Sequence, residues 1–163
     1  MTERYTVRVT KDYLVFSTGH FITFDGDKCE RLHGHNYRVA VEVDAPLDAN
    51  HYAFDFIALR DLTREITDEL DHRMLVPATS PLLKCDVSAE RVTIRFARKE
   101  WVFPREDCIV LPIPNTTTEL LAKHVAQKLI TALKARHHFV PDVVRVEVEE
   151  NFGQSATYEV RPS

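Results

Sequence analysis

The segment HGHNYRVAVEVDA at residues 33–45 decides how this chain folds. Its apolar side chains recur at every second position: Tyr37, Val39, Val41 and Val43. A period of two is typical of a β-strand that buries one face, so we expect a strand over residues 37–44. Two histidines separated by a glycine, His33 and His35, stand at the entry of this strand.

Alternating and β-branched residues predict further strands on both sides of this segment. One covers residues 5–16, with His20 at the end of the extended stretch. A hairpin is expected from residues 91–96 and 100–103, followed by an extended piece at 107–111. The tail supplies two more strands, at residues 143–150 and 155–161, joined by a turn at 151–153.

Apolar residues at helical spacing predict two helices. Asp55 is placed as the N-cap of the first, which covers residues 56–70. The second begins near Thr116, which matches a capping box with Glu119, and runs to about His137. This order of elements predicts an α+β fold, with an antiparallel sheet and two helices packed on one face.

Composition narrows the class of protein. The 163 residues carry a net charge of −4, which gives no support for nucleic-acid binding. No apolar stretch has the length of a secretory signal or a membrane span. The three cysteines, Cys29, Cys85 and Cys108, are scattered and odd in number, which argues against a disulfide framework. We expect one cytoplasmic domain over residues 1–163, without nucleic-acid or membrane partners.

Three histidines have the spacing of a metal site. His33 and His35 project from the same face of an extended backbone. If the preceding strand pairs with theirs, His20 lies beside the same point. Three neutral imidazoles with one open position describe a catalytic zinc site. Surface histidines at strand ends are the alternative interpretation.

Cys29 lies four residues before His33, in the loop that leads to the two histidines. Beside a metal ion, its thiol would become a thiolate able to act as a base or nucleophile. A fourth zinc ligand is the alternative. Cys85 and Cys108 have no histidine neighbours, and we interpret both as small apolar residues.

Five motifs in the chain resemble those of the 6-pyruvoyl-tetrahydropterin synthase and 6-carboxy-tetrahydropterin synthase family. They are FSTGH at residues 16–20, CERLHGHNY at 29–37, Leu70-Asp71-His72, Thr117-Thr118-Glu119, and Glu150 eight residues before Tyr158. Together they cover nearly the whole chain.

The resemblance implies the tunnelling fold, in which hairpins and helices of several subunits assemble into a barrel. It also implies a homo-oligomer, typically a hexamer, with active sites between subunits. The implied activity is that of a zinc-dependent lyase whose small-molecule substrate, 7,8-dihydroneopterin triphosphate, loses its triphosphate. The implied zinc ligands are His20, His33 and His35.

The same resemblance suggests roles for proton-transfer residues. Cys29 would remove a proton from the substrate side chain, and Asp71 with His72 would form a second proton-transfer pair. From the residues alone, Asp71 and His72 mark a helix end, where a histidine suits the negative end of the helix dipole.

For the pterin ring, the resemblance implies that Glu150 anchors it through paired hydrogen bonds. Thr117 and Thr118 are implied substrate contacts. Glu149 replaces Glu150 if the strand register shifts by one residue. An exposed charge on an acidic edge strand is the alternative for Glu150.

Glu30 directly follows Cys29, and a related branch of the family carries its catalytic base at this spacing from the HGH motif. That branch cleaves the side chain to give 6-hydroxymethyl-dihydropterin for folate synthesis. A solvated loop charge is the alternative for Glu30. The leading expectation is a different product, 6-carboxy-5,6,7,8-tetrahydropterin for queuosine synthesis, which the short interval from Cys29 to His33 favours over 6-pyruvoyl-tetrahydropterin; the folate product ranks second. A metal- or pterin-binding protein without turnover stays open as another class.

The interval between Asp71 and Thr117 is longer than in compact members of the family. The resemblance therefore marks residues of about 78–112, which include the expected hairpin, as an insertion. Such a segment would extend the sheet, cover the site or enlarge a subunit contact. Trp101 within it is interpreted as a packing residue.

Overall fold

Four strands form the antiparallel part of the main sheet, in the order β11-β10-β4-β1 from one edge inward. The computed structural model describes residues 3–162 and gives these strands as β1 Tyr5–His20, β4 His33–Ala45, β10 Val143–Asn151 and β11 Gln154–Val160. The strands predicted from alternation are confirmed, and β1 and β4 extend to the histidines. Because β10 lies between β4 and β11, Glu150 is not on an edge strand.

Two short strands extend this sheet on the far side of β1. β5 (Arg73–Pro77) runs parallel to β1, and β9 (Cys108–Leu111) runs parallel to β5, so the complete sheet is mixed. The sequence analysis does not predict β5. Its last four residues are all buried, so the strand lacks the alternation that reveals a half-exposed strand.

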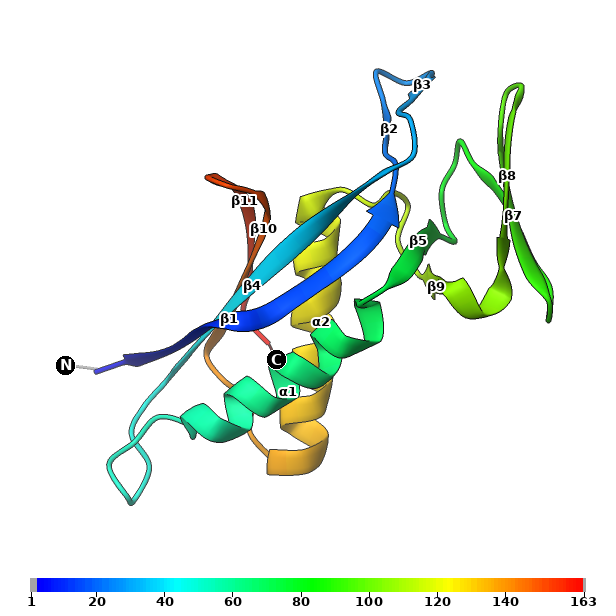
Figure 1. Ribbon diagram of the computed structural model, residues 1–163. Helices are drawn as coiled ribbons and strands as arrows, with labels where there is room; N and C mark the ends of the chain where they lie inside the picture. Colours follow the sequence, from blue (N-terminus) through cyan, green and yellow to red (C-terminus); the bar gives the residue numbers. More distant parts are fainter. Residues whose placement is uncertain (1–2, 163) are drawn as a thin grey trace.

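Both helices cover the same face of the main sheet, as predicted (Figure 1). α1 (Phe56–Leu70) packs on β1, and α2 (Thr118–His137) packs on β10, β11 and α1. Asp55 caps α1 as expected, because its carboxylate accepts a hydrogen bond from the Ile57 N–H at 2.7 Å. Within the described residues, neither helix combines the length and apolar character that crossing a membrane requires.

The start of α2 differs from the prediction. Its N-cap is Thr117, whose side chain makes no capping hydrogen bond. The buried Thr116 hydroxyl instead donates to the Phe21 carbonyl at 3.0 Å. The predicted capping box of Thr116 with Glu119 is therefore wrong, because the loop after β1 occupies that hydroxyl.

The main core lies between the sheet and the two helices. Phe16 of β1 stacks on Tyr37 of β4 with ring centroids 4.9 Å apart, and both side chains are fully buried. Because side chains alternate along a strand, His20 lies on the face of Phe16, and His35 on the face of Tyr37. The histidine-bearing ends of β1 and β4 thus continue the helix-covered face.

The segment expected to be an insertion, residues of about 78–112, contains a second sheet of three strands, β6 (Lys84–Val87), β7 (Arg91–Phe96) and β8 (Lys99–Pro104), here called the inserted sheet. The hairpin predicted there is confirmed as β7 and β8, and the turn Arg105–Asp107 leads back to β9. A smaller apolar cluster, which includes Phe21 and Ile94, joins this sheet to the main one.

The loop between β1 and β4 carries a small ladder of its own, β2 (Thr23–Phe24) paired with β3 (Lys28–Cys29). At the base of the loop, β1 and β4 pair with His20 opposite His33 and Gly19 opposite Gly34. A Cβ atom at Gly34 would lie 2.9 Å from the Thr18 carbonyl oxygen, so only glycine permits this approach of the two backbones.

Replacing Gly34 by alanine should therefore lower the free energy of unfolding by about 1–3 kcal/mol, because the new methyl group meets rigid backbone. The matched control is Gly19→Ala, whose Cβ would have the flexible Met74 side chain as its nearest neighbour at 3.4 Å and the His33 carbonyl oxygen only at 3.8 Å. Urea unfolding of both variants measures the difference. Equal stabilities for the two would show that β1 and β4 can separate locally without cost.

Candidate metal centre and pocket

Three histidine side chains meet where β1 ends and β4 begins. His20 stands at the end of β1, and His33 and His35 follow in the first residues of β4. One ring nitrogen from each lies within 4.8 Å of the others. The structure thus brings together the three residues that spacing singled out, and this group could hold a metal ion.

Backbone carbonyls set the orientation of two of these rings. His20 Nδ1 lies 3.1 Å from the Thr116 carbonyl oxygen, and His33 Nδ1 lies 2.8 Å from that of Arg31. A carbonyl only accepts, so each Nδ1 carries the proton and each Nε2 keeps a lone pair. This arrangement is typical of metal-binding histidines, whose second nitrogen is held by the protein.

His35 provides a test of whether the site fits a metal. Its Nε2 is buried and has no hydrogen-bond partner among the described residues. Glu150 Oε1 lies 3.3 Å away, but the geometry does not make a hydrogen bond. A buried polar atom without a partner is costly, and a metal ion would satisfy it. The donor set therefore fits a metal.

Burial favours the metal-binding form of the His20 ring. Desolvation lowers the pKa of the His20 imidazole, the Thr116 carbonyl opposes this shift, and nearby His33 and His35 add to it. A lowered pKa favours the neutral ring, which is the form that binds a metal. Tyr37 Oη lies 3.1 Å from His20 Nε2 and completes the buried surroundings.

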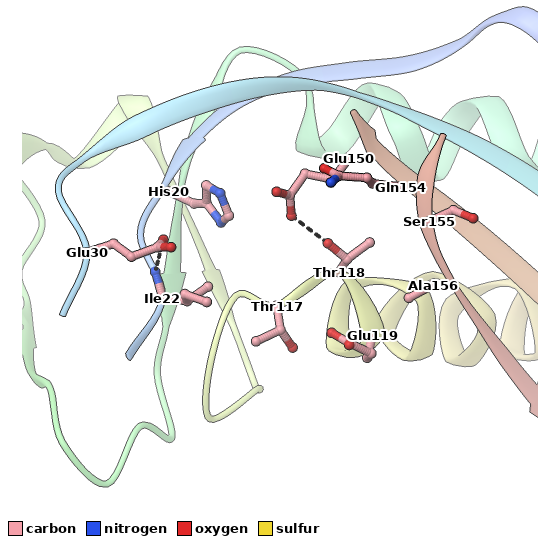
Figure 2. Close-up of a pocket in the computed structure, with 10 residues that line it drawn as sticks. All are labelled: His20, Ile22, Glu30, Thr117, Thr118, Glu119, Glu150, Gln154, Ser155 and Ala156. Atoms are coloured by element: carbon pink, nitrogen blue, oxygen red, sulfur yellow. Dashed lines mark hydrogen bonds between the residues drawn. The ribbon is translucent and has the colours of Figure 1, made fainter. Parts of the chain in front are cut away.

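A pocket of about 440 Å³ opens beside His20 (Figure 2). Its size falls in the range of small-molecule sites. The lining comes from the end of β1, the loop after it, the start of α2 and the hairpin of β10 and β11: His20, Ile22, Glu30, Thr117, Thr118, Glu119, Glu150, Gln154, Ser155 and Ala156.

Glu150 reaches this pocket from the end of β10. The pairing of β10 with β11 shifts between Glu149 and Asn151, which leaves Glu150 in an irregularity of the ladder. Its Oε2 accepts a hydrogen bond from the Thr118 hydroxyl at 2.6 Å. Glu149 does not line this pocket, and its Oε1 accepts from the Gly153 N–H at 3.1 Å. The pocket thus contains the residue predicted to anchor a pterin, rather than its neighbour.

Glu30 lines the same pocket, whereas Cys29 does not. Glu30 Oε2 accepts from the Ile22 N–H at 3.2 Å and lies 4.0 Å from His33 Nε2. Cys29 packs against the smaller apolar cluster under the inserted sheet. Burial raises the pKa of its thiol, Lys99 opposes this shift, and Glu30 adds to it.

Asp71 and His72 form a hydrogen-bonded pair outside the pocket. His72 Nδ1 lies 2.7 Å from Asp71 Oδ2, and the other carboxylate oxygen accepts from the Ser17 N–H at 2.6 Å. Burial opposes ionisation of Asp71, but the Ser17 N–H and the His72 ring hold its pKa below the usual value. The His72 side chain is 82% exposed. The two side chains are thus hydrogen-bonded to each other, and the imidazole faces solvent.

The structure places Thr117 and Thr118 in the lining of the pocket together with Gln154, Ser155 and Ala156, which the sequence analysis does not single out. These three residues follow the turn at the tip of the β10–β11 hairpin. Ser155 lies opposite Glu149 in the ladder. The pairing register of the predicted hairpin would have located them, because it brings residues 154–156 beside the end of β10 that carries Glu150.

Two archaeal relatives match most of the chain. A protein of Methanocaldococcus jannaschii is 32% identical over 146 residues, which cover 89% of each chain. A protein of Pyrococcus horikoshii is 34% identical over 132 residues, which cover 79% of this chain and 78% of the relative. Both bear the provisional name 6-carboxy-5,6,7,8-tetrahydropterin synthase.

Solved structures with the same fold include 6-pyruvoyltetrahydropterin synthases from two malaria parasites. The Plasmodium vivax enzyme superposes with a TM-score of 0.90 at 27% identity, covering 99% of this chain and all of that one. The Plasmodium falciparum enzyme gives 0.88 at 29% identity, with the same coverage. In one Plasmodium vivax variant, a glutamate described as a catalytic residue is replaced by alanine.

The family model of 6-pyruvoyl tetrahydropterin synthase matches residues 8–161. This match spans the histidine cluster, the pocket and both helices. The fold is accordingly the tunnelling fold of these synthases. The chain belongs to the 6-pyruvoyl tetrahydropterin synthase family.

Proposed function

We propose that this chain is a zinc-dependent lyase that acts on the side chain of 7,8-dihydroneopterin triphosphate, either cleaving a carbon–carbon bond, so that the triphosphate leaves on the released two-carbon fragment, or eliminating the triphosphate. The observation that carries the proposal is the pocket itself, where the three-histidine cluster has the carboxylates of Glu30 and Glu150 close to its rings. Membership of the pterin synthase family supports the substrate class. A protein that only binds metal or pterin would not need a second carboxylate beside the histidines.

Zinc suits the donor set of His20, His33 and His35, because three neutral imidazoles leave one coordination position open for substrate. When bound, zinc would supply Lewis-acid activation of the hydroxyl groups on the substrate side chain. Cys29 packs into the apolar cluster, which favours an open fourth position over a fourth protein ligand.

Glu150 is the proposed anchor for the pterin ring. An ionised carboxylate has room for about four hydrogen bonds, and Thr118 occupies one of them. The amino group and the adjacent ring N–H of a pterin form a planar donor pair that one carboxylate can accept. Thr117, the N-cap without a capping bond, presents a further polar group to the ligand.

Glu30 is the proposed proton acceptor. It lines the pocket close to the His33 ring, whereas Cys29 packs into the smaller apolar cluster, where burial raises the pKa of its thiol. The Plasmodium vivax enzyme also has a glutamate described as catalytic. These observations support Glu30 over the sequence-based preference for Cys29 in this role.

The position of Glu30 favours 6-hydroxymethyl-dihydropterin as the product, because the resemblance links a glutamate base to side-chain cleavage. The second candidate product is 6-carboxy-5,6,7,8-tetrahydropterin, which the names of the archaeal relatives support. Both reactions use the same substrate and pocket. 6-Pyruvoyl-tetrahydropterin is the third outcome that the family resemblance leaves open.

Asp71 and His72 are proposed to serve a pocket on a second copy of the chain. The pair has a fixed imidazole tautomer and an exposed ring, but neither residue lines the pocket of its own chain. A homo-oligomer, with the hexamer implied by the resemblance, would bring an exposed pair of this kind to a neighbouring site.

Metal content provides the first test. The purified chain should bind about one zinc ion per subunit, and His35→Ala should lose most of it, since two imidazoles hold zinc weakly. His72→Ala is the control and should keep its metal. Metal analysis after dialysis measures both, and cobalt substitution should show no thiolate ligand. Full zinc retention by His35→Ala would place the metal elsewhere.

Product analysis tests the proton acceptor. With 7,8-dihydroneopterin triphosphate, Glu30→Gln should lower kcat by about 10²–10⁴-fold, the usual contribution of a general base. Cys29→Ala should lower it by less than about tenfold, since its side chain packs into the smaller apolar cluster and does not line the pocket. Mass spectrometry should identify 6-hydroxymethyl-dihydropterin. If the chain instead forms 6-carboxy-tetrahydropterin, and this product disappears in Cys29→Ala but persists in Glu30→Gln, then Cys29 rather than Glu30 is the proton acceptor.

Neopterin binding tests the ring anchor. The Glu150→Gln variant should bind neopterin about 10–100-fold more weakly, because hydrogen bonds to a charged acceptor contribute about 1.5–3 kcal/mol. Glu149→Gln, one residue away but outside the pocket, is the matched control and should change affinity less than about twofold. Isothermal titration calorimetry measures both. Similar losses in the two variants would indicate a general charge effect rather than a specific contact.

A further inference from the structure

The loop that carries Cys29 and Glu30 is held by the inserted sheet. Lys99, the first residue of β8, donates from Nζ to the Cys29 carbonyl at 2.9 Å and reaches the Glu30 carbonyl at 3.4 Å. Two consecutive carbonyls of the proposed catalytic loop thus share one ammonium group. Figure 1 shows the β2–β3 loop and the β7–β8 hairpin at the same end of the molecule.

A stacked aromatic pair places the Lys99 side chain. Trp101 of β8 stacks on Phe21 with ring centroids 4.4 Å apart, and Phe21 directly follows His20. Lys99 Nζ lies 5.9 Å from the centre of the Trp101 ring, within reach of a cation–π attraction. The same β-strand thus contacts both ends of the loop, beside His20 and beside Glu30.

The charge of Lys99 is directed at the loop rather than at a carboxylate. Within residues 3–162, Lys99 forms no ion pair, and the adjacent Glu100 pairs with Arg95. On the other side of the loop, Asn115 holds Thr23 through two hydrogen bonds, of 3.2 and 2.8 Å. The part of the loop near Cys29 and Glu30 is instead held by a side chain of the inserted sheet, that of Lys99.

We propose that Lys99 is a positioning residue for Glu30: by holding the carbonyls of Cys29 and Glu30, it keeps the Glu30 carboxylate in the pocket beside the histidine cluster. This inference rests on the proposed role of Glu30 as proton acceptor. A displacement of about 1 Å in a reacting group can cost about 10²-fold in rate. The inserted sheet would thereby act on the reaction without contacting the substrate.

The test compares Lys99→Met, which removes the donor, with Lys99→Arg, which keeps it. Lys84→Met is the matched control, because Lys84 lies exposed on β6 of the same sheet and, within residues 3–162, no hydrogen bond or ion pair joins it to the loop. Lys99→Met should lower kcat about 10–100-fold with KM changed less than about twofold. Lys99→Arg should recover most of the rate, and Lys84→Met should match the unaltered chain. A raised KM with unchanged kcat in Lys99→Met would overturn the proposal, since it would make Lys99 a substrate contact.

Hydrogen exchange separates this inference from the proposed function. In Lys99→Met, amides of residues 22–31 should exchange at least about fivefold faster, including the Glu30 N–H that bonds the Ile22 carbonyl at 3.0 Å. Amides of β1 and β4 should be unchanged. Faster loop exchange in a chain that turns over no pterin would support the anchoring and reject the proposed function. Unchanged loop exchange would overturn the anchoring whatever the activity.

Discussion

The pairing register of β1 with β4 is the constraint on which the rest of the site depends. It sets His20 opposite His33 on the helix-covered face, and His35 follows two residues later on the same face. A shift of one residue would turn these side chains to opposite faces. Gly34 makes the register possible, because any side chain there would meet the Thr18 carbonyl. The histidine cluster that could hold a metal ion is therefore a property of two paired strands rather than of a flexible loop.

Local sequence patterns explain why most of the long strands, both helices and the grouping of the histidines could be predicted from the sequence. The alternation of residues 37–43 and the helical spacing behind Asp55 report which face of each element is buried, and burial is what forms those elements. The histidines could be grouped because strand periodicity and hairpin pairing place them together. The limits appear where contacts come from distant segments. β5 has no alternation because both of its faces are covered, and Thr116 bonds Phe21 instead of capping its own helix.

The inserted segment shows the same limit at a larger scale. Its hairpin is visible in the sequence, but nothing local indicates that Trp101 stacks on Phe21, some eighty residues earlier. Trp101 is a packing residue, as interpreted, yet its partner directly follows one of the three clustered histidines. The inserted sheet thus neither lengthens the main sheet nor lines the pocket. It supports the loop that links the two histidine-bearing strands.

Cys29 and Glu30 are adjacent, and consecutive side chains of an extended chain point to opposite sides. One of them must then face the pocket while the other faces the apolar cluster, and here the carboxylate lines the pocket. This arrangement is favourable for both side chains, because a thiol is readily buried among apolar groups, whereas a carboxylate needs polar partners such as the Ile22 N–H. A slip of this loop by one residue would exchange the two groups without altering the histidine cluster. Which of the two side chains enters the pocket thus depends on the contacts that hold the loop backbone in place.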